Sequence, residues 1–269
     1  MKKFAVIGNP ISHSLSPSIH GIFAETLGLD IQYDAVEVEI QDFEEKLNSL
    51  FSQGYIGLNV TLPLKEKAFS VAKKHTEICS AARSANTLWK EGGVLCADST
   101  DGAGLMEDLI SKGLNVKGSN IVVLGAGGSS KAILPSLLKA EPKEVIIVNR
   151  TISKAKNLAE VYSSDKVKVS HGSLIDEVPF EIDGLINTTS AGLLGQELMY
   201  PKNLFHFNPW SYDLSYGEKT TEFNELAIKN NISRVHDGLG MLFRQAALSL
   251  KIWTGLKPNA EEAMKIFRI

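Results

Sequence analysis

The stretch NIVVLGAGGSSKAILPSLLKA, residues 120–140, decides the fold class of this chain. An apolar run, Ile121–Leu124, leads directly into the glycine-rich segment Gly125–Ser130, and a helical pattern follows. A strand, a glycine-rich turn and a helix in this order are typical of a dinucleotide-binding unit, although glycines can also form a plain turn. A second apolar run, Val145–Val148, begins where the next strand is expected. The context therefore favours dinucleotide binding.

The end of that second run indicates which dinucleotide is bound. Sites for NAD usually carry Asp or Glu there, and this carboxylate binds the ribose 2′-hydroxyl. This chain instead has Asn149-Arg150-Thr151, followed by Lys154. Arginine forms planar, bidentate contacts with phosphate, so the sequence favours NADP. The alternative is that Arg150 is a solvated side chain at the end of a strand.

Strand and helix patterns alternate along most of the chain. Strands are predicted at 3–7, 32–37, 55–60, 86–89, 94–97, 167–170, 184–187, 211–214 and 233–235. Helices are predicted at 17–27, 42–53, 64–72 and 102–112, and the tail from Leu239 reads as helical, with a last helix at 259–267. This alternation predicts an α/β chain of two units, each with a mainly parallel sheet covered on both faces. Pro135 lies deep inside a predicted helix, where it removes one backbone hydrogen bond.

Composition excludes several classes of protein. The chain has 269 residues and a net charge of −3, with no basic block that would bind nucleic acid or an anionic membrane. No apolar run reaches the length of a membrane span. The two cysteines, Cys79 and Cys96, have no metal or redox spacing, so a reduced, cytoplasmic location is expected. No spacing of His, Cys and carboxylates predicts a metal site.

The segment GNPISHSLSPSIHG, residues 8–21, carries several hydroxyl groups just after the first predicted strand. Ser16-Pro17 is a good helix start, with Ser16 as the N-cap and proline in the first turn. Ser12, Ser14 and Ser16 alternate, so in an extended chain their hydroxyls point the same way. A row of hydroxyls beside a helix N-terminus can bind an anion. From this segment alone, an anion site and a capped turn stay equally open.

Further polar residues follow the predicted strands of the first unit. Thr61 and Lys65 come just after one strand, where open α/β sheets place their ligand sites, and Asn86 and Asp101 lie at similar turns. Taken singly, Lys65 could be a solvated surface charge and Asp101 a helix N-cap. Together they offer a hydroxyl, an amine, an amide and a carboxylate, which suits a small, hydroxylated, anionic substrate.

Seven motifs occur along the chain: GNPISHSLSPSIHG (8–21), GLNVTLPLKE (57–66), SANTL (84–88), TDGAG (100–104), LGAGGSSKA (124–132), NRT (149–151) and DGLGMLFRQAALSLKIWTG (237–255). These motifs and their order give the chain a resemblance to the shikimate/quinate dehydrogenase family over its whole length. The resemblance implies an α/β substrate-binding domain at 1–101, a Rossmann-type NADP-binding domain at 102–237, and C-terminal helices at 238–269 that return to the substrate domain. Ser129-Ser130 stands where the family usually has two alanines.

The resemblance also implies an activity, the reversible reduction of 3-dehydroshikimate to shikimate by NADPH in the aromatic amino-acid pathway. It implies Lys65 and Asp101 as catalytic residues. The substrate-binding residues would be Ser14, Ser16, Thr61, Lys65, Asn86, Asp101, Tyr216 and Gln245. The cofactor-binding residues would be Gly125, Ala126, Gly127, Gly128, Ser129, Asn149, Arg150, Thr151, Lys154, Thr188, Leu214, Gly238 and Met241. The expected partner is the small-molecule substrate alone, bound by a monomer or a homodimer.

Two alternative functions stay open at this point. A quinate or quinate/shikimate dehydrogenase of broader specificity is similar in sequence, but such enzymes often have an acid after the second strand and a threonine in place of one serine. A non-catalytic, ligand-sensing relative is expected to have lost Lys65 or Asp101, and both are present.

Overall fold

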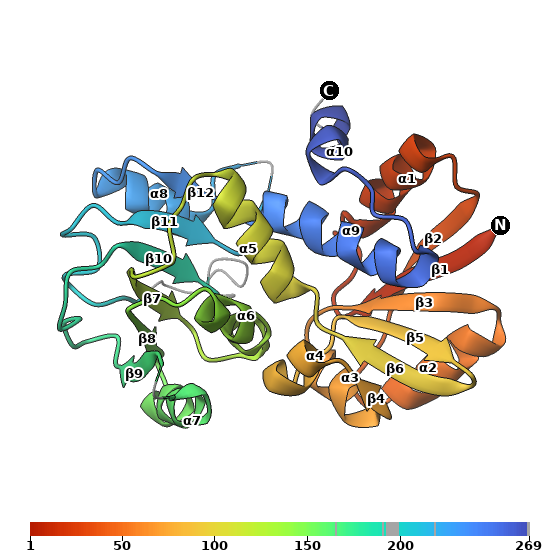
Figure 1. The fold of residues 1–269 in the computed structure, drawn as a ribbon, viewed down its shortest axis with the longest axis horizontal. Coiled ribbons are helices and arrows are strands. Elements are labelled where there is room, and N and C mark those ends of the chain that lie inside the picture. Colours follow the sequence, from red (N-terminus) through yellow and green to blue (C-terminus); the bar gives the residue numbers. More distant parts are fainter. Residues whose placement is uncertain (165, 190, 192–198, 218, 268–269) are drawn as a thin grey trace. The chain divides into compact units, whose positions relative to one another are not determined.

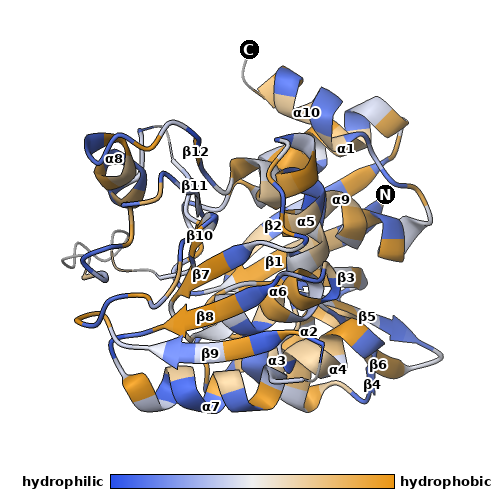
Figure 2. Ribbon diagram, turned by 60° about the vertical axis from the view of Figure 1, so that its left-hand side comes forward, coloured by the Kyte–Doolittle hydropathy of each residue, from blue (hydrophilic) through white to orange (hydrophobic). Residues whose placement is uncertain are grey.

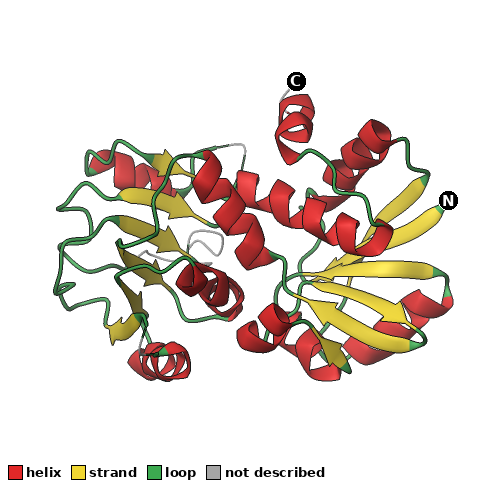
Figure 3. Ribbon diagram, viewed as in Figure 1, coloured by secondary structure: helices red, strands yellow, loops and turns green. Residues whose placement is uncertain are grey.

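The computed structural model describes residues 1–164, 166–189, 191, 199–217 and 219–267 (Figure 1). The chain divides into two compact units: unit 1 contains Met1–Gly104 and Leu242–Ile269, and unit 2 contains Leu105–Met241. Both divisions fall inside helices, α5 (Asp101–Ser111) and α9 (Leu239–Thr254). The α/β class predicted from the sequence is confirmed, because each unit holds one sheet and several helices (Figure 3).

Unit 1 is built on a six-stranded sheet with the order β2-β1-β3-β5-β6-β4. Its strands are β1 (Lys2–Gly8), β2 (Ile31–Glu37), β3 (Tyr55–Val60), β4 (Lys74–His75), β5 (Thr87–Glu91) and β6 (Val94–Asp98). Its helices besides α9 are α1 (Ser16–Leu27), α2 (Phe43–Ser52), α3 (Lys65–Val71), α4 (Glu77–Ala82) and α10 (Ala260–Phe267). The short elements β4 and α4 were not predicted from the sequence, because neither is long enough to establish a hydrophobic period.

One strand of this sheet runs against the others. β5 pairs antiparallel with both β3 and β6, whereas the β1–β2, β1–β3 and β4–β6 pairs are parallel. The start of β5 therefore lies beside the ends of its neighbours, and Thr87 pairs with Asn59 on one side and Asp98 on the other. As a result, the residues after β1, β3 and β6 and those before β5 lie at the same end of the strands, which we call the shared edge of the sheet.

The core of unit 1 is closed by the C-terminal helices. One face of the sheet packs Ala5, Ile7 and Leu58 into a buried apolar cluster. Aromatic rings join the sheet to the C-terminal helices: Phe4 stacks on Trp253 of α9 with the ring centroids 4.9 Å apart. Phe23 of α1 meets Phe243 of α9 edge-on at 6.2 Å, and Phe243 in turn meets Phe267 of α10 at 5.5 Å. The C-terminal helices therefore pack against the N-terminal part of the chain within unit 1.

A histidine is enclosed in this aromatic region. His20 is fully buried on α1 and stacks on Tyr33 with the ring centroids 4.1 Å apart. Burial lowers the pKa of His20 to about 3, and contact with the Asn59 side chain offsets part of that effect. The ring is therefore neutral in the folded protein at physiological pH, whereas in the unfolded chain it titrates near its ordinary pKa of about 6.5.

This difference predicts a specific loss of stability in acid. Between pH 6.5 and 3 the unfolded chain binds a proton at His20 that the folded chain does not, so the free energy of unfolding falls as the pH falls. Relative to pH 7.5, the contribution at pH 5 is a loss of about 2 kcal/mol. Urea unfolding at both pH values should show this extra loss in the wild type and not in His20→Phe. His13→Gln is the control, because His13 is exposed. An equal pH dependence in the wild type and His20→Phe would contradict the assignment.

Unit 2 is built on a six-stranded parallel sheet with the order β12-β11-β10-β7-β8-β9. Its strands are β7 (Asn120–Leu124), β8 (Glu144–Val148), β9 (Lys168–Gly172), β10 (Gly184–Asn187), β11 (Trp210–Asp213) and β12 (Val235–His236). Its helices besides α5 are α6 (Gly128–Lys139), α7 (Ile152–Tyr162) and α8 (Glu222–Lys229). Counted from β7, this is the doubly wound order of a Rossmann fold, in which the strand order reverses between β7 and β10.

Both faces of this sheet are buried, which explains the continuous apolar strands. Ile121 and Val123 of β7 face one cluster with residues of α5, α6 and α7, whereas Val122 and Leu124 face a second cluster with residues of α8. This alternation follows the two-residue period of a strand. Figure 2 shows the hydrophobic residues running along β8, in contrast to the mixed surface of α7.

The proline predicted inside a helix is accommodated by a neighbouring side chain. Pro135 lies within α6, so the carbonyl of Lys131, four residues earlier, loses its usual helical N–H donor. The hydroxyl of Tyr162, at the end of α7, donates to this carbonyl across 3.4 Å. The contact links the two helices that follow β7 and β8.

Among the described residues, none of the helices is long and apolar enough to cross a membrane. Within the same part of the chain, no group of three or more His, Cys, Asp or Glu side chains could hold a metal ion.

Candidate active site

Four predicted residues from distant parts of the chain meet at the shared edge of the unit 1 sheet. Lys65 begins α3, Asn86 precedes β5, Asp101 begins α5, and Gln245 lies on α9. The Lys65 Nζ lies 2.7 Å from Asp101 Oδ2, and the two side chains are only 13% and 8% exposed. The other carboxylate oxygen, Oδ1, accepts a hydrogen bond from Asn86 Nδ2 at 3.0 Å. Asp101 thus binds the amine with one oxygen and the amide with the other.

The Asn86 amide connects this ion pair to α9. Its Nδ2 also donates to Gln245 Oε1 at 3.0 Å, and its Oδ1 accepts from the Thr100 backbone N–H at 2.8 Å. Asn86 and Gln245 are 3% and 8% exposed, so their side chains are held inside the protein. We call Lys65, Asn86, Asp101 and Gln245 the lysine cluster. The antiparallel direction of β5 brings Asn86 to this edge, because a parallel strand would place its start at the opposite one.

The serine segment approaches the same edge after β1. The backbone N–H of Asn9 donates to Leu62 O at 2.9 Å, which ties the start of this segment to the turn after β3 that carries Thr61. The Thr61 methyl group lies where a side chain on Gly8 would project, 2.3 Å from the ideal Cβ position, so only glycine fits there. The predicted serines and Thr61 are therefore brought to one end of the sheet.

Two expectations for the serines are wrong. Ser16 is the first residue of α1, and Leu15 occupies the N-cap without a side-chain cap. The hydroxyl that binds the helix start belongs to Ser14, whose Oγ accepts from the Ser16 N–H at 3.3 Å. The segment is also not extended, because the Ser14 N–H donates to Ile11 O at 3.0 Å and closes a turn, leaving Ser12 exposed. The prediction that the Ser12, Ser14 and Ser16 hydroxyls point the same way required an extended chain, and the turn at 11–14 removes that condition.

The glycine-rich segment of unit 2 turns sharply out of β7. Gly125 has a φ of +106°, and a side chain there would overlap Thr188 Oγ1 at 2.4 Å. Ser130 is fully buried, and its hydroxyl lies 2.8 Å from Gly125 O and 2.6 Å from Thr188 Oγ1. Ser130, at a position where the family usually has alanine, therefore links the glycine-rich loop to Thr188 at the end of β10 by hydrogen bonds. Thr188 itself donates to Leu124 O at 2.7 Å.

Beyond this turn, the start of α6 is open. Gly127 is the N-cap in an extended conformation, and α6 begins at Gly128. An added Cβ at either glycine would meet nothing within 4 Å, so the missing side chains leave room in front of the helix. The first N–H groups of a helix lack partners within it, and they attract anions. This arrangement fits a pyrophosphate group.

The residues after β8 are those predicted to select the cofactor. Asn149 Nδ2 donates to Thr151 O at 3.0 Å, and Thr151 is the N-cap of α7. Arg150 and Lys154 are exposed at this turn. Their two positive charges, without an acidic residue between 149 and 154, fit a phosphate better than a ribose hydroxyl.

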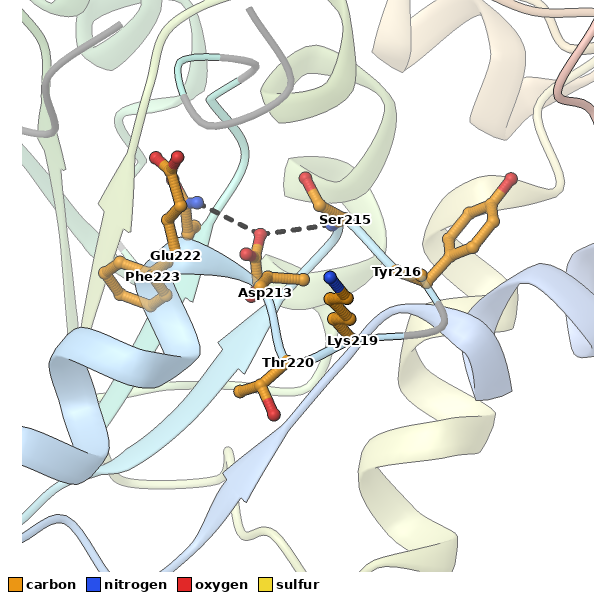
Figure 4. Close-up of a pocket in the computed structure, with 10 residues that line it drawn as sticks. Asp213, Ser215, Tyr216, Lys219, Thr220, Glu222 and Phe223 are labelled. Atoms are coloured by element: carbon orange, nitrogen blue, oxygen red, sulfur yellow. Dashed lines mark hydrogen bonds between the residues drawn. The ribbon is translucent and has the colours of Figure 1, made fainter. Parts of the chain in front are cut away.

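The remaining predicted residues of unit 2 lie after β11 and β12. Gly238 approaches Leu214 so closely that a Cβ would lie 2.1 Å from the Leu214 carbonyl oxygen, and Met241 is buried in the first turn of α9. Tyr216 lines a pocket of about 250 Å³ together with Asp213, Ser215 and Lys219. Figure 4 shows the Tyr216 ring pointing away from Asp213. Burial raises the pKa of the Asp213 carboxyl, and hydrogen bonds from Thr221, Ser215 and Asn187 offset part of that rise.

Sequence reasoning missed several polar residues beside the lysine cluster. Asn59, Thr87, Thr100 and Ser249 are buried and hydrogen-bonded to it or to each other. One signal was available: Ser249 follows Gln245 by one helical turn on a predicted helix that is mostly apolar.

Comparison with protein families accounts for most of the chain. The shikimate dehydrogenase substrate binding domain matches residues 6–88, the shikimate/quinate 5-dehydrogenase family matches residues 106–195, and the shikimate 5′-dehydrogenase C-terminal domain matches residues 238–265. The chain belongs to the shikimate dehydrogenase family. The resemblance inferred from the seven motifs is therefore confirmed.

Individual members of the shikimate dehydrogenase family match over nearly the full length. A protein of Legionella pneumophila (strain Lens) named shikimate dehydrogenase (NADP(+)) is 41% identical, over 100% of this chain and 99% of its own. A protein of Vibrio atlanticus with the same name is 39% identical, over 99% of this chain and 96% of its own. The crystal structure of shikimate 5-dehydrogenase from Thermus thermophilus in complex with NADP(H) and shikimate superimposes with a TM-score of 0.87. It is 31% identical and covers 100% of this chain and 99% of its own.

Proposed function

We propose that this chain is an NADP-dependent shikimate dehydrogenase that interconverts 3-dehydroshikimate and shikimate. The observation that carries this proposal is the buried pair of Lys65 and Asp101, held by Asn86 and Gln245 at one edge of a sheet. A pair of this kind can deliver a proton to a substrate oxygen or remove one. Family membership and the names of its relatives support the same activity.

In this proposal the substrate is bound by unit 1. The Ser14 and Ser16 hydroxyls bind the carboxylate of shikimate, and Thr61, Lys65, Asn86, Asp101 and Gln245 bind its ring oxygens, with Tyr216 of unit 2 as a further contact. The contacts of the lysine cluster support the second set, because its amide and carboxylate groups are already oriented by hydrogen bonds. A ring with several hydroxyl groups requires such fixed donors and acceptors, since an unpaired buried polar group is costly.

The cofactor is bound by unit 2. The open N-terminus of α6 receives the pyrophosphate, and Arg150, with Asn149, Thr151 and Lys154, receives the 2′-phosphate of the adenosine ribose. Gly125, Ala126, Gly127, Gly128, Ser129, Thr188, Leu214, Gly238 and Met241 complete the proposed site. The open space at Gly127 and Gly128 supports this arrangement.

NADPH, when bound, supplies the hydride that reduces the substrate ketone. Lys65 donates a proton to the oxygen that was the ketone, and in the reverse direction it removes the proton from the hydroxyl. Asp101 holds the amine in place and keeps a negative charge beside it. A lysine in this position also stabilises negative charge on the oxygen as the hydride arrives.

Steady-state kinetics test the proposal directly. Purified protein is assayed with shikimate and with quinate, each with NADP+ and with NAD+, by the absorbance of the reduced cofactor. We expect kcat/KM to be highest for shikimate with NADP+. A preference for quinate would instead support a quinate/shikimate dehydrogenase of broader specificity, an alternative that is consistent with the match to the shikimate/quinate 5-dehydrogenase family. Absence of turnover with both substrates, in protein that still binds shikimate, would indicate a ligand-sensing relative.

The expected cytoplasmic location is part of the proposal. Cys79 and Cys96 are both free and buried, as is usual for a protein of a reducing compartment.

A further inference from the structure

A buried asparagine outside the predicted site is bonded to several of its parts. Asn59 lies near the end of β3 and is 6% exposed. Its Nδ2 lies 3.0 Å from the Asn86 carbonyl oxygen and 2.9 Å from Ser249 Oγ, and its Oδ1 lies 2.7 Å from the Tyr33 hydroxyl. One side chain therefore joins β2, β3, the start of β5 and α9.

The partners fix which way the Asn59 amide points. The Asn86 carbonyl can only accept a hydrogen bond, so the amide nitrogen must face it and the amide oxygen must face Tyr33. The Tyr33 proton is then donated to Asn59 Oδ1, which leaves the phenol oxygen free to accept. The Ser16 hydroxyl interacts with this same phenol. Tyr33 thus lies between Asn59 and Ser16, a proposed ligand of the substrate carboxylate.

The nitrogen of the Asn59 amide contacts the elements that carry the lysine cluster. Ser249 Oγ lies 2.7 Å from Thr87 Oγ1 and accepts from Asn59, so α9 is held against the start of β5. Gln245 lies one turn earlier on α9, where it accepts from Asn86 Nδ2. Loss of the Asn59 amide would remove one of the two hydrogen bonds to the Asn86 carbonyl and one of the bonds that hold the helix turn of Gln245 and Ser249.

We propose that Asn59 is a positioning residue for substrate binding, which holds Ser16, Asn86 and Gln245 in one geometry. The inference rests on the proposed function. Asn59 is almost wholly buried and acts through these residues, so its effect should appear in KM for shikimate more than in kcat. The cofactor is assigned to unit 2, and its KM should therefore be unaffected.

The test compares two equally buried asparagines. Asn59→Leu removes the amide at the proposed position. Asn203→Leu is the matched control, because Asn203 in unit 2 is 8% exposed and binds the Val178 N–H and carbonyl at 2.9 and 2.8 Å. Both variants should melt at a lower temperature, since each loses buried hydrogen bonds. Only Asn59→Leu should raise KM for shikimate, by about 10-fold, while KM for NADP+ stays unchanged in both.

Milder variants keep the inference testable if Asn59→Leu does not fold. Tyr33→Phe deletes only the hydroxyl between Asn59 and Ser16, and Ser249→Ala deletes the link to α9. Each should raise KM for shikimate by about 3-fold or more and leave kcat within about 2-fold. Wild-type KM in both would overturn the inference. That result differs from failure of the proposed function, in which the wild type itself would not turn over shikimate.

Discussion

Replacing Lys65 with alanine is expected to lower kcat for shikimate oxidation by about 10²–10⁴, the usual range for loss of a general acid or base. The Nζ of Lys65 lies 2.7 Å from Asp101 and is nearly buried, so the remaining residues would leave the reacting oxygen without a proton donor. KM for shikimate should change much less, because the proposed serine and amide contacts remain. Asp101→Asn should also lower kcat, since the amine loses its charged partner. Initial rates at saturating substrate measure both effects.

The same helix supplies a control for this experiment. Lys67, two residues after Lys65 on α3, is partly exposed and forms an ion pair with Glu44. Lys67→Ala removes an equal charge from α3 and should keep the wild-type kcat. If Lys65→Ala also kept the wild-type kcat and only raised KM, Lys65 would be a binding residue and the proton transfer would need another group.

Replacing Arg150 with alanine is expected to raise KM for NADP+ by about 5- to 150-fold, which corresponds to the loss of about 1–3 kcal/mol from a charge-assisted hydrogen bond. KM for NAD+ should hardly change, because NAD+ has no 2′-phosphate for Arg150 to bind. The experiment measures both constants at saturating shikimate. Equal losses with both cofactors would show that Arg150 acts on a part of the cofactor that the two share.

A nearby lysine provides the matched variant. Lys156 lies on α7, six residues after Arg150, and is exposed beside Glu160. Lys156→Ala changes the net charge of this surface by the same amount and should leave the preference for NADP+ intact. A similar loss of NADP+ binding in Lys156→Ala would indicate a general electrostatic effect of the surface.

The parts of the fold that depend on local sequence were predictable. The apolar run, the glycine segment and the helix at 120–139 appear where the sequence placed them, because strand period, turn chemistry and helix period agree there. The direction of β5 was not predictable from its own residues. It follows from the two-glycine turn at Gly92 and Gly93, both with positive φ, which joins β5 to β6 as a hairpin.

Individual residues of the candidate site were predictable from the sequence, but the hydrogen bonds that join them were not. Lys65, Asn86 and Asp101 follow or precede strands, and that position alone suggests a shared edge. The bonds from Asn59 to Ser249 and from Thr87 to Ser249 join residues far apart in the chain, and no local pattern encodes such pairs. Ser16 failed as a cap for a related reason: after the turn at 11–14, Ser16 is the first residue of α1, and its N–H donates to the Ser14 hydroxyl.

The discontinuous make-up of unit 1 dictates the order in which the newly synthesised chain can fold. Unit 2 is one continuous segment, so all of its described strands have been synthesised once Met241 has been added. At that moment Phe4 and Phe23 still lack their ring partners on α9, and Asn59 still lacks Ser249. Contacts between the two ends of a chain form slowly, because a long loop must close first. The part of the protein that is made first is therefore the part that is completed last, and until then its aromatic core depends on residues not yet translated.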